Sequence, residues 1–222
     1  MHILLAAATT FEIQPAIDFL TLSRRSGHQT GTLITGVGCM ATVYSLMRQI
    51  DRLRPDIIIQ AGIAGCWTGR QPGEVFAVRE EFQGDQGVWE DGRFKSVFDL
   101  KLADKDAFPF TDGLLVNPYK KLLTLTSLEA VRGITVNEIT TDPRRIEGRN
   151  NAPVVESMEG AGLHYVCLQE GIAFLQLRSV SNDIGVRDKT KWDIKKAIDR
   201  LNDRLIFLLE KLYKEDKSII DP

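Results

Sequence analysis

Short, uninterrupted runs of apolar residues alternate along this chain with segments whose apolar residues recur at steps of three and four. The clearest runs are Ile3–Ala8, Thr32–Val37 and Asp56–Ala61, and weaker ones are Val75–Val78, Val154–Val155 and Ile172–Val180. A continuous apolar run is typical of a strand covered on both faces. The helical segments lie at about 12–21, 40–53, 118–130, 158–170 and 190–214. This alternation predicts an α/β fold with a mainly parallel sheet, and we expect a three-layer αβα sandwich with a mixed central sheet.

The composition is that of an ordinary globular protein without a strong charge bias. The 222 residues are 43% hydrophobic, and 28 basic residues are balanced by 30 acidic ones, for a net charge of −2. One domain of this length buries enough surface to be stable alone. We therefore expect a single domain over residues 1–222, with a tail at about 215–222 outside its ordered part. A nucleic-acid-binding domain would show a basic excess, so nucleic acid is not an expected partner.

Cysteine and histidine usage indicates neither disulfides nor a metal site. The three cysteines are Cys39, Cys66 and Cys167, and no two of them form a CxxC pair, which favours a reducing compartment. The histidines are His2, His28 and His164, and none has a cysteine or carboxylate at metal-ligand spacing. The apolar start is too short for a membrane span and lacks the basic flank of a signal peptide. We expect a cytoplasmic protein with no membrane contact.

Ligands in α/β folds bind beyond the carboxyl ends of the strands, so polar residues at those ends are the first candidates for a site. Thr9 and Glu12 follow the first apolar run. Their spacing is that of a capping box, in which the threonine caps a helix and the glutamate reaches back. A carboxylate at a strand end also suits a general base that deprotonates a water molecule. The residues alone leave both interpretations of Glu12 open.

Glycine-rich turns follow the second and third runs. The segment GVGCMA at 36–41 has the form of the dinucleotide-binding pattern GxGxxA. That pattern requires an acid near the end of the next strand, whereas here the next strand begins with Asp56 and ends in Gln60 and Ala61. A nicotinamide cofactor is therefore not expected. The segment GIAG at 62–65 suits either a tight turn or a ligand held against backbone N–H groups.

Two further strand ends carry polar groups. Glu156 and Glu159 flank the start of a predicted helix. Acidic residues there complement the helix dipole, but a carboxylate with two acceptor oxygens also suits the cis-diol of a sugar. Asn182 and Asp183 end the longest apolar run, where they either cap a turn or contact a ligand. The polar, glycine-containing segment 80–115 predicts a loop-rich excursion that we expect at the mouth of the site.

Five features in this order resemble the nucleoside phosphorylase and nucleosidase superfamily, in particular its purine nucleosidases, which hydrolyse N-glycosidic bonds. They are Glu12, TGVG at 35–38, DIIIQAGIAG at 56–65, ESMEG at 156–160 and LRSVSN at 177–182. The resemblance spans residues 2 to about 212. It implies that Glu12 activates the attacking water and that Glu159 binds the 2′ and 3′ hydroxyls of the ribose. It also implies that Met158 packs on the sugar and that Asn182 engages N7 of the departing purine.

Departures from the family pattern narrow the subclass. Methylthioadenosine/S-adenosylhomocysteine (MTA/SAH) nucleosidases carry aspartate at the position of Asn182, as a general acid for adenine N7. An amide cannot donate its proton outright, but it hydrogen-bonds N7 and O6 of a 6-oxopurine, unless a register shift places Asp183 there. Ile63 stands where the family turn has serine, and Gln60 stands where phosphate-binding phosphorylases have arginine. The resemblance therefore implies water, rather than phosphate, as the nucleophile.

With TVNEIT at 135–140 and SNDIGVRD at 181–188, the chain resembles the futalosine hydrolase branch, which releases hypoxanthine from futalosine in a route to menaquinone. This resemblance implies an N-glycosyl hydrolase that needs no cofactor or metal and forms a homo-oligomer. It further implies substrate contacts from Gly62, Ile63 and Asn137, the last in a loop beside the base. Three alternatives stay open: an MTA/SAH-type nucleosidase, a purine nucleoside phosphorylase, and a catalytically silent nucleoside-binding protein.

Overall fold

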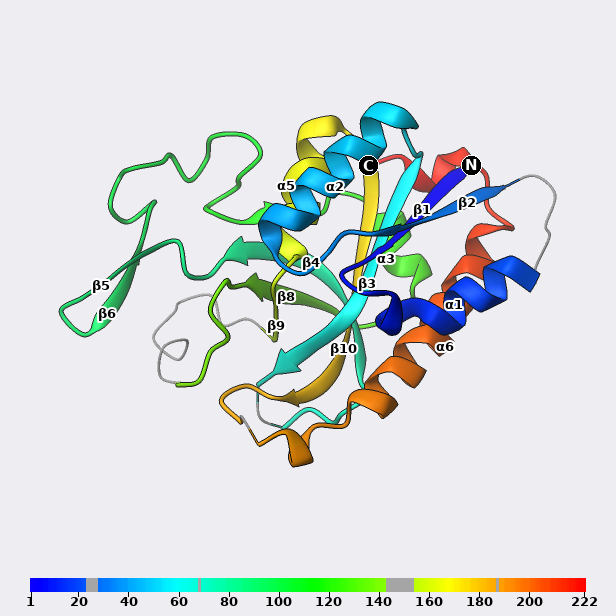
Figure 1. Ribbon diagram of the computed structural model, residues 1–222. Coiled ribbons are helices and arrows are strands. Elements are labelled where there is room, and N and C mark those ends of the chain that lie inside the picture. The colour runs from blue at the N-terminus through cyan, green and yellow to red at the C-terminus, as the bar shows by residue number, and fades with distance from the viewer. Residues whose placement is uncertain (23–27, 68, 143–153, 187) are drawn as a thin grey trace.

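The computed structural model describes residues 1–22, 28–67, 69–142, 154–186 and 188–222 (Figure 1). Its centre is an eight-stranded mixed sheet. The strands of that sheet are β1 (His2–Ala7), β2 (Gln29–Ile34), β3 (Ile57–Cys66), β4 (Val75–Gln83), β7 (Leu115–Val116), β8 (Ala130–Thr135), β9 (Val155–Ser157) and β10 (Ala173–Asp183). A separate hairpin, β5 (Gly87–Glu90) with β6 (Arg93–Ser96), projects from the body of the molecule (Figure 1).

The sheet curls until part of it closes on itself. β10 pairs in parallel with β3 on one side and antiparallel with β4 on the other. Strands β4, β8, β9 and β3 then follow in order, so five strands form a closed ring. β1 and β2 extend from β3 as an open parallel sheet. The mixed central sheet expected from the sequence is confirmed, and its closure depends on pairing between strands that are distant in the chain.

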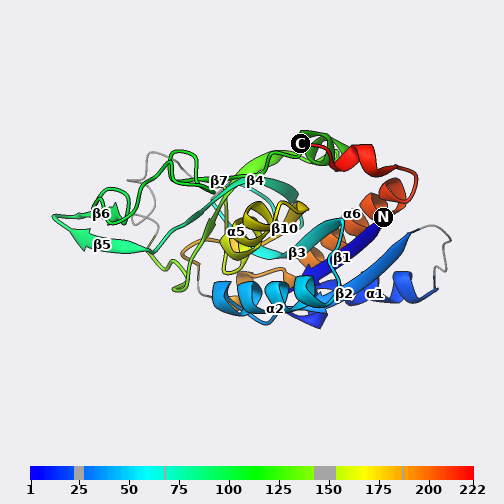
Figure 2. The same ribbon diagram turned by 90° about the horizontal axis from the view of Figure 1, so that it is seen from above.

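Helices pack on both sides of this sheet (Figure 2). They are α1 (Thr10–Leu22), α2 (Cys39–Arg52), α3 (Lys120–Leu125), α5 (Gly160–Glu170) and α6 (Ile194–Leu212), with 3₁₀ turns at Lys189–Lys191 and Lys217–Ile220. α2 packs on α5, which contacts β4, β8 and β10, whereas α1 packs on α6, which covers β3 and β10. The predicted apolar stripe of α6 is confirmed, since its leucines at 201, 205, 208 and 212 are buried. No helix in the described ranges is long and apolar enough to cross a membrane.

The structure differs from the sequence prediction in three segments. Of the predicted helix 118–130 only Lys120–Leu125 is helical, because the chain turns at Ser127 with a positive φ and then joins the sheet as β8. The segment 80–115 begins with the end of β4 and contains the projecting hairpin. The tail expected outside the ordered part carries a 3₁₀ turn, and Lys217 Nζ lies 2.7 Å from Asp56 Oδ1.

Candidate active site

A cavity of about 350 Å³ opens where β1, β3, β9 and β10 end. Five of the residues predicted from the sequence line it, namely Glu12, Ile63, Met158, Glu159 and Asn182. Parallel strands end at the same edge of a sheet, which is why residues from opposite ends of the chain meet here. The lining contains no residue of segment 80–115, so the expectation that this excursion borders the site is wrong for the cavity seen in the described residues.

Glu12 acts as a helix-capping residue and faces the cavity at the same time. Its Oε2 accepts hydrogen bonds from the backbone N–H and the hydroxyl of Thr9, each at 3.0 Å. Its Oε1 accepts from the backbone N–H of Ile63 at 3.1 Å. The carboxylate is thus buried, fixed on three sides and part of the cavity wall. The capping-box spacing is real, and it orients the candidate base without excluding it from the site.

Arg178 is a buried arginine in the middle of β10 and pairs with Glu159. Its Nη1 lies 3.4 Å from Glu159 Oε2, and its Nη2 donates to Gln60 Oε1 at 2.9 Å. Gly62 leaves the space that the guanidinium and the Glu12 carboxylate both approach. A Cβ on Gly62 would collide with Arg178 Nη1 and lie 2.9 Å from Glu12 Oε1. The glycine is therefore needed for close approach, and Gly62 supports the charged groups from behind without lining the cavity.

Glu159 is the second carboxylate that lines the cavity. It occupies the N-cap position of α5, yet its side chain makes no capping hydrogen bond there. Instead its Oε1 accepts from the backbone N–H of Gly38 at 3.0 Å, across 121 residues of sequence. Gly38 has a φ of 97°, a conformation that favours glycine. The turn at 36–41 therefore serves as a clamp for this carboxylate, and Glu159 does not cap its own helix.

Asn182, and not Asp183, is the residue of this pair that lines the cavity. A bulge in β10 between Val180 and Asn182 sets this orientation. The amide is held at both ends, because Oδ1 accepts from Ser181 Oγ at 2.8 Å and Nδ2 donates to the Asp183 carbonyl at 3.0 Å. One N–H of the amide stays available to a ligand, which gives a neutral hydrogen-bond donor at the end of β10.

Asn137 lies on the surface and outside the cavity lining. Its Nδ2 donates to Asp85 Oδ1 at 3.1 Å, and its backbone N–H also donates to Asp85. Its neighbours Val136, Ile139 and Thr140 contribute to the cavity wall instead. The loop 135–140 thus borders the site as predicted, but through other side chains.

Sequence reasoning gave Arg178 no role in the site, although the residue stands in the strand-end motif LRSVSN. Arg178 is 1% exposed, and Gln60, Gln176 and Glu81 are buried within the same sheet. A charge inside an apolar run is a usable signal, since a buried arginine requires ionic or hydrogen-bonding partners. Its partners come from other strands, so the sequence does not name them. Glu156 was also given no specific role, yet it lines the cavity, and its Oε1 accepts from the Thr140 N–H at 3.1 Å.

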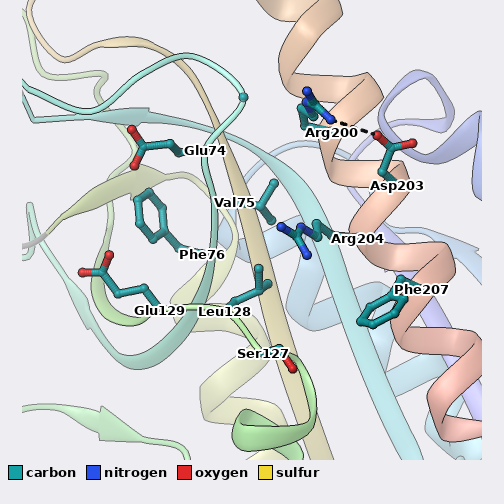
Figure 3. Close-up of a pocket in the computed structure, with 11 residues that line it drawn as sticks. Glu74, Val75, Phe76, Ser127, Leu128, Glu129, Arg200, Asp203, Arg204 and Phe207 are labelled. Carbon is teal, nitrogen blue, oxygen red and sulfur yellow. Dashed lines mark ion pairs between the residues drawn. The ribbon is translucent and has the colours of Figure 1, made fainter.

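No group of three or more metal-ligating side chains occurs among the described residues. A larger cavity of about 730 Å³ lies between α6 and the start of β4 (Figure 3). Its walls carry Glu74 and Glu129 on one side and Arg200 and Arg204 on the other. None of the strand-end groups described above takes part in it. Its charged side chains are exposed except for the half-buried Glu74, and Arg200 pairs with Asp203 at 3.6 Å.

The fold and the strand-end site together define the class of this protein. A model of the Phosphorylase superfamily matches residues 7–214, and the chain belongs to that family. Among solved structures, an MTA/SAH nucleosidase superposes with a TM-score of 0.77 at 18% identity, covering 98% of both chains. Futalosine hydrolase of Helicobacter pylori superposes with a TM-score of 0.76 at 14% identity, covering 95% of this chain and 98% of that one.

Sequence relatives within the family are more specific. The chain is 29% identical over 175 residues to futalosine hydrolase of Thermus thermophilus, covering 76% of each protein. It is 30% identical over 174 residues to futalosine hydrolase of Acidothermus cellulolyticus, covering 76% of this chain and 70% of that one. An MTA/SAH nucleosidase of Psychromonas ingrahamii is 25% identical over 178 residues, covering 76% of this chain and 74% of that one.

Proposed function

We propose that this chain is an N-glycosyl hydrolase that cleaves futalosine and releases hypoxanthine. The observation that carries the proposal is one cavity lined by two fixed carboxylates, Glu12 and Glu159, and by the Asn182 amide, with Glu159 paired to the buried Arg178. The sequence similarity to futalosine hydrolases supports the choice of substrate. The reaction needs no metal or cofactor, because every step below uses a side chain of this site.

The site suits an oxocarbenium-like transition state. Glu159 accepts hydrogen bonds from the two ribose hydroxyls, and Met158 packs on the sugar. Water attacks C1′ while Glu12 takes its proton, and the electrons of the C1′–N9 bond leave with the purine. Both carboxylates stabilise the positive charge that develops on the ribose. The Asn182 N–H donates to N7 as negative charge builds on the departing base.

The charge of the cavity favours water over phosphate. Arg178 is the buried cation near Glu12 and Glu159, and it already pairs with Glu159 and hydrogen-bonds Gln60. Ile63 supplies no hydroxyl, and its backbone N–H is bonded to Glu12. A phosphate dianion would therefore meet two carboxylates without an uncommitted cation at this turn. The neutral water molecule has no such penalty.

The decisive experiment is a product assay with futalosine, inosine and methylthioadenosine, each with and without phosphate. We expect futalosine to yield hypoxanthine and a free sugar at a rate that phosphate does not change. Ribose 1-phosphate formed from inosine would show a phosphorylase, and preferred release of adenine would show an MTA/SAH-type nucleosidase. Binding of the nucleoside without release of a base would show a silent binding protein.

Glu12→Gln tests the assignment of the base. We expect kcat to fall about 10²- to 10⁴-fold, the usual contribution of a general base. The amide fills the same space but accepts hydrogen bonds at one end only, so a stability loss of about 1 kcal/mol should accompany the change. Asp18→Asn on the same helix is the matched control, since Asp18 is exposed and hydrogen-bonds Gln14 within α1. Full activity of Glu12→Gln would leave Glu12 with its capping role alone.

The proposed physiological role is the release of hypoxanthine in the futalosine route to menaquinone. It predicts that the gene lies near other genes of that route and that its deletion creates a requirement for menaquinone. Normal menaquinone levels in the deletion strain would argue against this role. We also propose that the protein acts in the cytoplasm, which fractionation of the cells would test.

We further propose that the protein is a homo-oligomer. Apolar side chains are exposed beside the cavity, with Phe11 67%, Val37 60%, Met40 86% and Tyr44 67% accessible. Phe11 and Val37 belong to the cavity wall itself. Covering this surface with a second copy would bury apolar area and shield the site from water. Light scattering at micromolar concentration tests this, and a monomer mass would overturn it.

A further inference from the structure

Glu81, near the end of β4, is a completely buried carboxyl group that the mechanism above does not use. It lies directly beneath the first turn of α5, the helix that begins after Glu159. A Cβ on Gly160 would collide with Glu81 Oε2, and one on Gly133 would lie 2.6 Å from it. Both glycines are thus required for the carboxyl to fit. Glu81 therefore packs against Gly160, the residue that follows Glu159, the candidate ribose-binding carboxylate.

The Gln176 amide connects Glu81 to His164. Gln176 Nε2 donates to Glu81 Oε2 at 3.0 Å, and the same amide contacts the His164 side chain on α5. His164 Nδ1 lies 3.0 Å from the carbonyl of Leu115, so Nδ1 must carry the hydrogen. Burial lowers the pKa of His164 to about 4, so the ring is neutral and its Nε2 is an acceptor.

This arrangement leaves three buried acceptors without a donor. They are Gln176 Oε1, His164 Nε2 and Glu81 Oε1. Reversing the amide would let Gln176 Nε2 donate to His164 Nε2, which satisfies the imidazole. Gln176 Oε1 would then face Glu81, and it would be satisfied only if the Glu81 carboxyl carried a proton to donate. The network therefore has two states, which differ by one proton and one amide reversal. The ionised state keeps the hydrogen bond from Gln176 to the carboxylate, and the protonated state satisfies Gln176 Oε1 and His164 Nε2.

The two states present different charges to Arg178, which lies two residues beyond Gln176 on the same face of β10. The titratable and charged groups that face Glu81 are Arg178 on β10, His164 on α5 and Cys39 on α2. His164 is neutral, and burial raises the pKa of the Cys39 thiol, so Arg178 is the one full charge among them. An ionised Glu81 attracts this guanidinium in competition with Glu159, whereas a neutral Glu81 does not.

We propose that Glu81 is a positioning residue for the hydrolytic site, and that protonation of Glu81 with reversal of the Gln176 amide sets how firmly Arg178 holds Glu159. The inference rests on the proposed function for its kinetic effect, but the switch itself does not. Burial raises the pKa of Glu81 to about 7, against hydrogen bonds from Gln176 and Thr135, so both states are populated near neutral pH.

Kinetics over about pH 5.5 to about pH 9 test the effect on the site. For the wild type we expect KM for the nucleoside to rise about fivefold through one ionisation near pH 7, the lower end of coupling between interacting sites, while kcat changes less. In Glu81→Gln the low KM should persist across the range, because the amide cannot ionise. Glu80→Gln is the matched control, since Glu80 pairs with Arg79 and Arg132 outside this network. An inflection retained in Glu81→Gln would overturn the proposal.

Two further measurements keep the inference testable. The first applies if Glu81→Gln does not fold, and the second applies if the nucleoside is not cleaved. Gln176→Met removes the hydrogen bond that stabilises the Glu81 carboxylate, so the pH midpoint of the change in KM should move to higher pH. An unchanged midpoint counts against the switch. The second measurement uses ¹⁵N-histidine NMR spectra of the wild type, which are simple because the chain has only three histidines. The His164 Nε2 resonance should shift near pH 7 without protonation of the ring, and a pH-independent resonance overturns the switch. Absence of any nucleoside hydrolysis would instead refute the proposed function.

Discussion

Glu81→Gln should make the protein more stable in neutral and alkaline solution, although it removes a hydrogen-bonded carboxyl group. Burial is the main reason that the pKa of Glu81 rises from 4.5 to about 7. An acid whose pKa is higher in the folded state contributes stability that is complete below its unfolded pKa. That contribution is lost as the pH rises through the folded pKa. The wild type should therefore lose stability between about pH 4.5 and about pH 7 through this one group.

The size of the effect follows from the two pKa values. A difference between 4.5 and about 7 corresponds to about 3 kcal/mol, since each unit is worth about 1.4 kcal/mol. The group is fully buried, so solvent screening does not reduce this figure. Glutamine has nearly the same shape as protonated glutamate and does not ionise. The stability advantage of Glu81→Gln should thus be small near pH 4.5 and approach about 3 kcal/mol above pH 7.

Urea denaturation at several pH values measures this difference directly, through the free energy of unfolding of each protein. The Glu80→Gln control should not gain stability with rising pH, because Glu80 forms ion pairs with Arg79 and Arg132 at the rim of the sheet. A difference between Glu81→Gln and wild type that stays constant from pH 4.5 to pH 8 would refute the reasoning. It would mean that Glu81 ionises equally easily in the folded and unfolded chains.

Three further predictions test other parts of the structure. Asn182→Asp should allow a proton to be delivered to N7 and so raise the rate with methylthioadenosine relative to futalosine; an unchanged ratio in the release of the two bases would contradict the leaving-group role. Asn202→Ala should cost about 2 kcal/mol or more in urea melts and lower kcat, because Asn202 Nδ2 donates to the Glu12 carbonyl at 2.9 Å from inside the core. Thiol reagents should modify the half-buried Cys39 before Cys66, whose pKa burial raises to about 12, and mass spectrometry of the labelled peptides would show the opposite order if the packing is wrong.

Much of the fold followed from local patterns in the sequence. The runs at the positions of β1, β3 and β10 are strands, and the apolar stripe at 194–212 is a buried face of α6. The polar residues at strand ends meet in one cavity because parallel strands deliver their ends to one edge of the sheet. The helix predicted at 118–130 is only Lys120–Leu125 in the structure, because the chain turns at Ser127 with a positive φ before β8 begins at Ala130. The residues of β8 are held as a strand by pairing with β4 and β9.

The sequence by itself determined the fold class, the family and the strand-end residues Glu12, Glu159 and Asn182, because these depend on patterns a few residues long. The tertiary structure decided where those residues lie and what they contact. Asn182 rather than Asp183 lines the cavity, and Asn137 hydrogen-bonds Asp85 outside it. The missing side chain of Gly62 leaves space for the charged groups beside it. The tertiary structure also assembled the buried network around Arg178. Ionisation and hydrogen bonding of such groups depend on which neighbours replace water, and those neighbours come from strands that meet only in the folded chain.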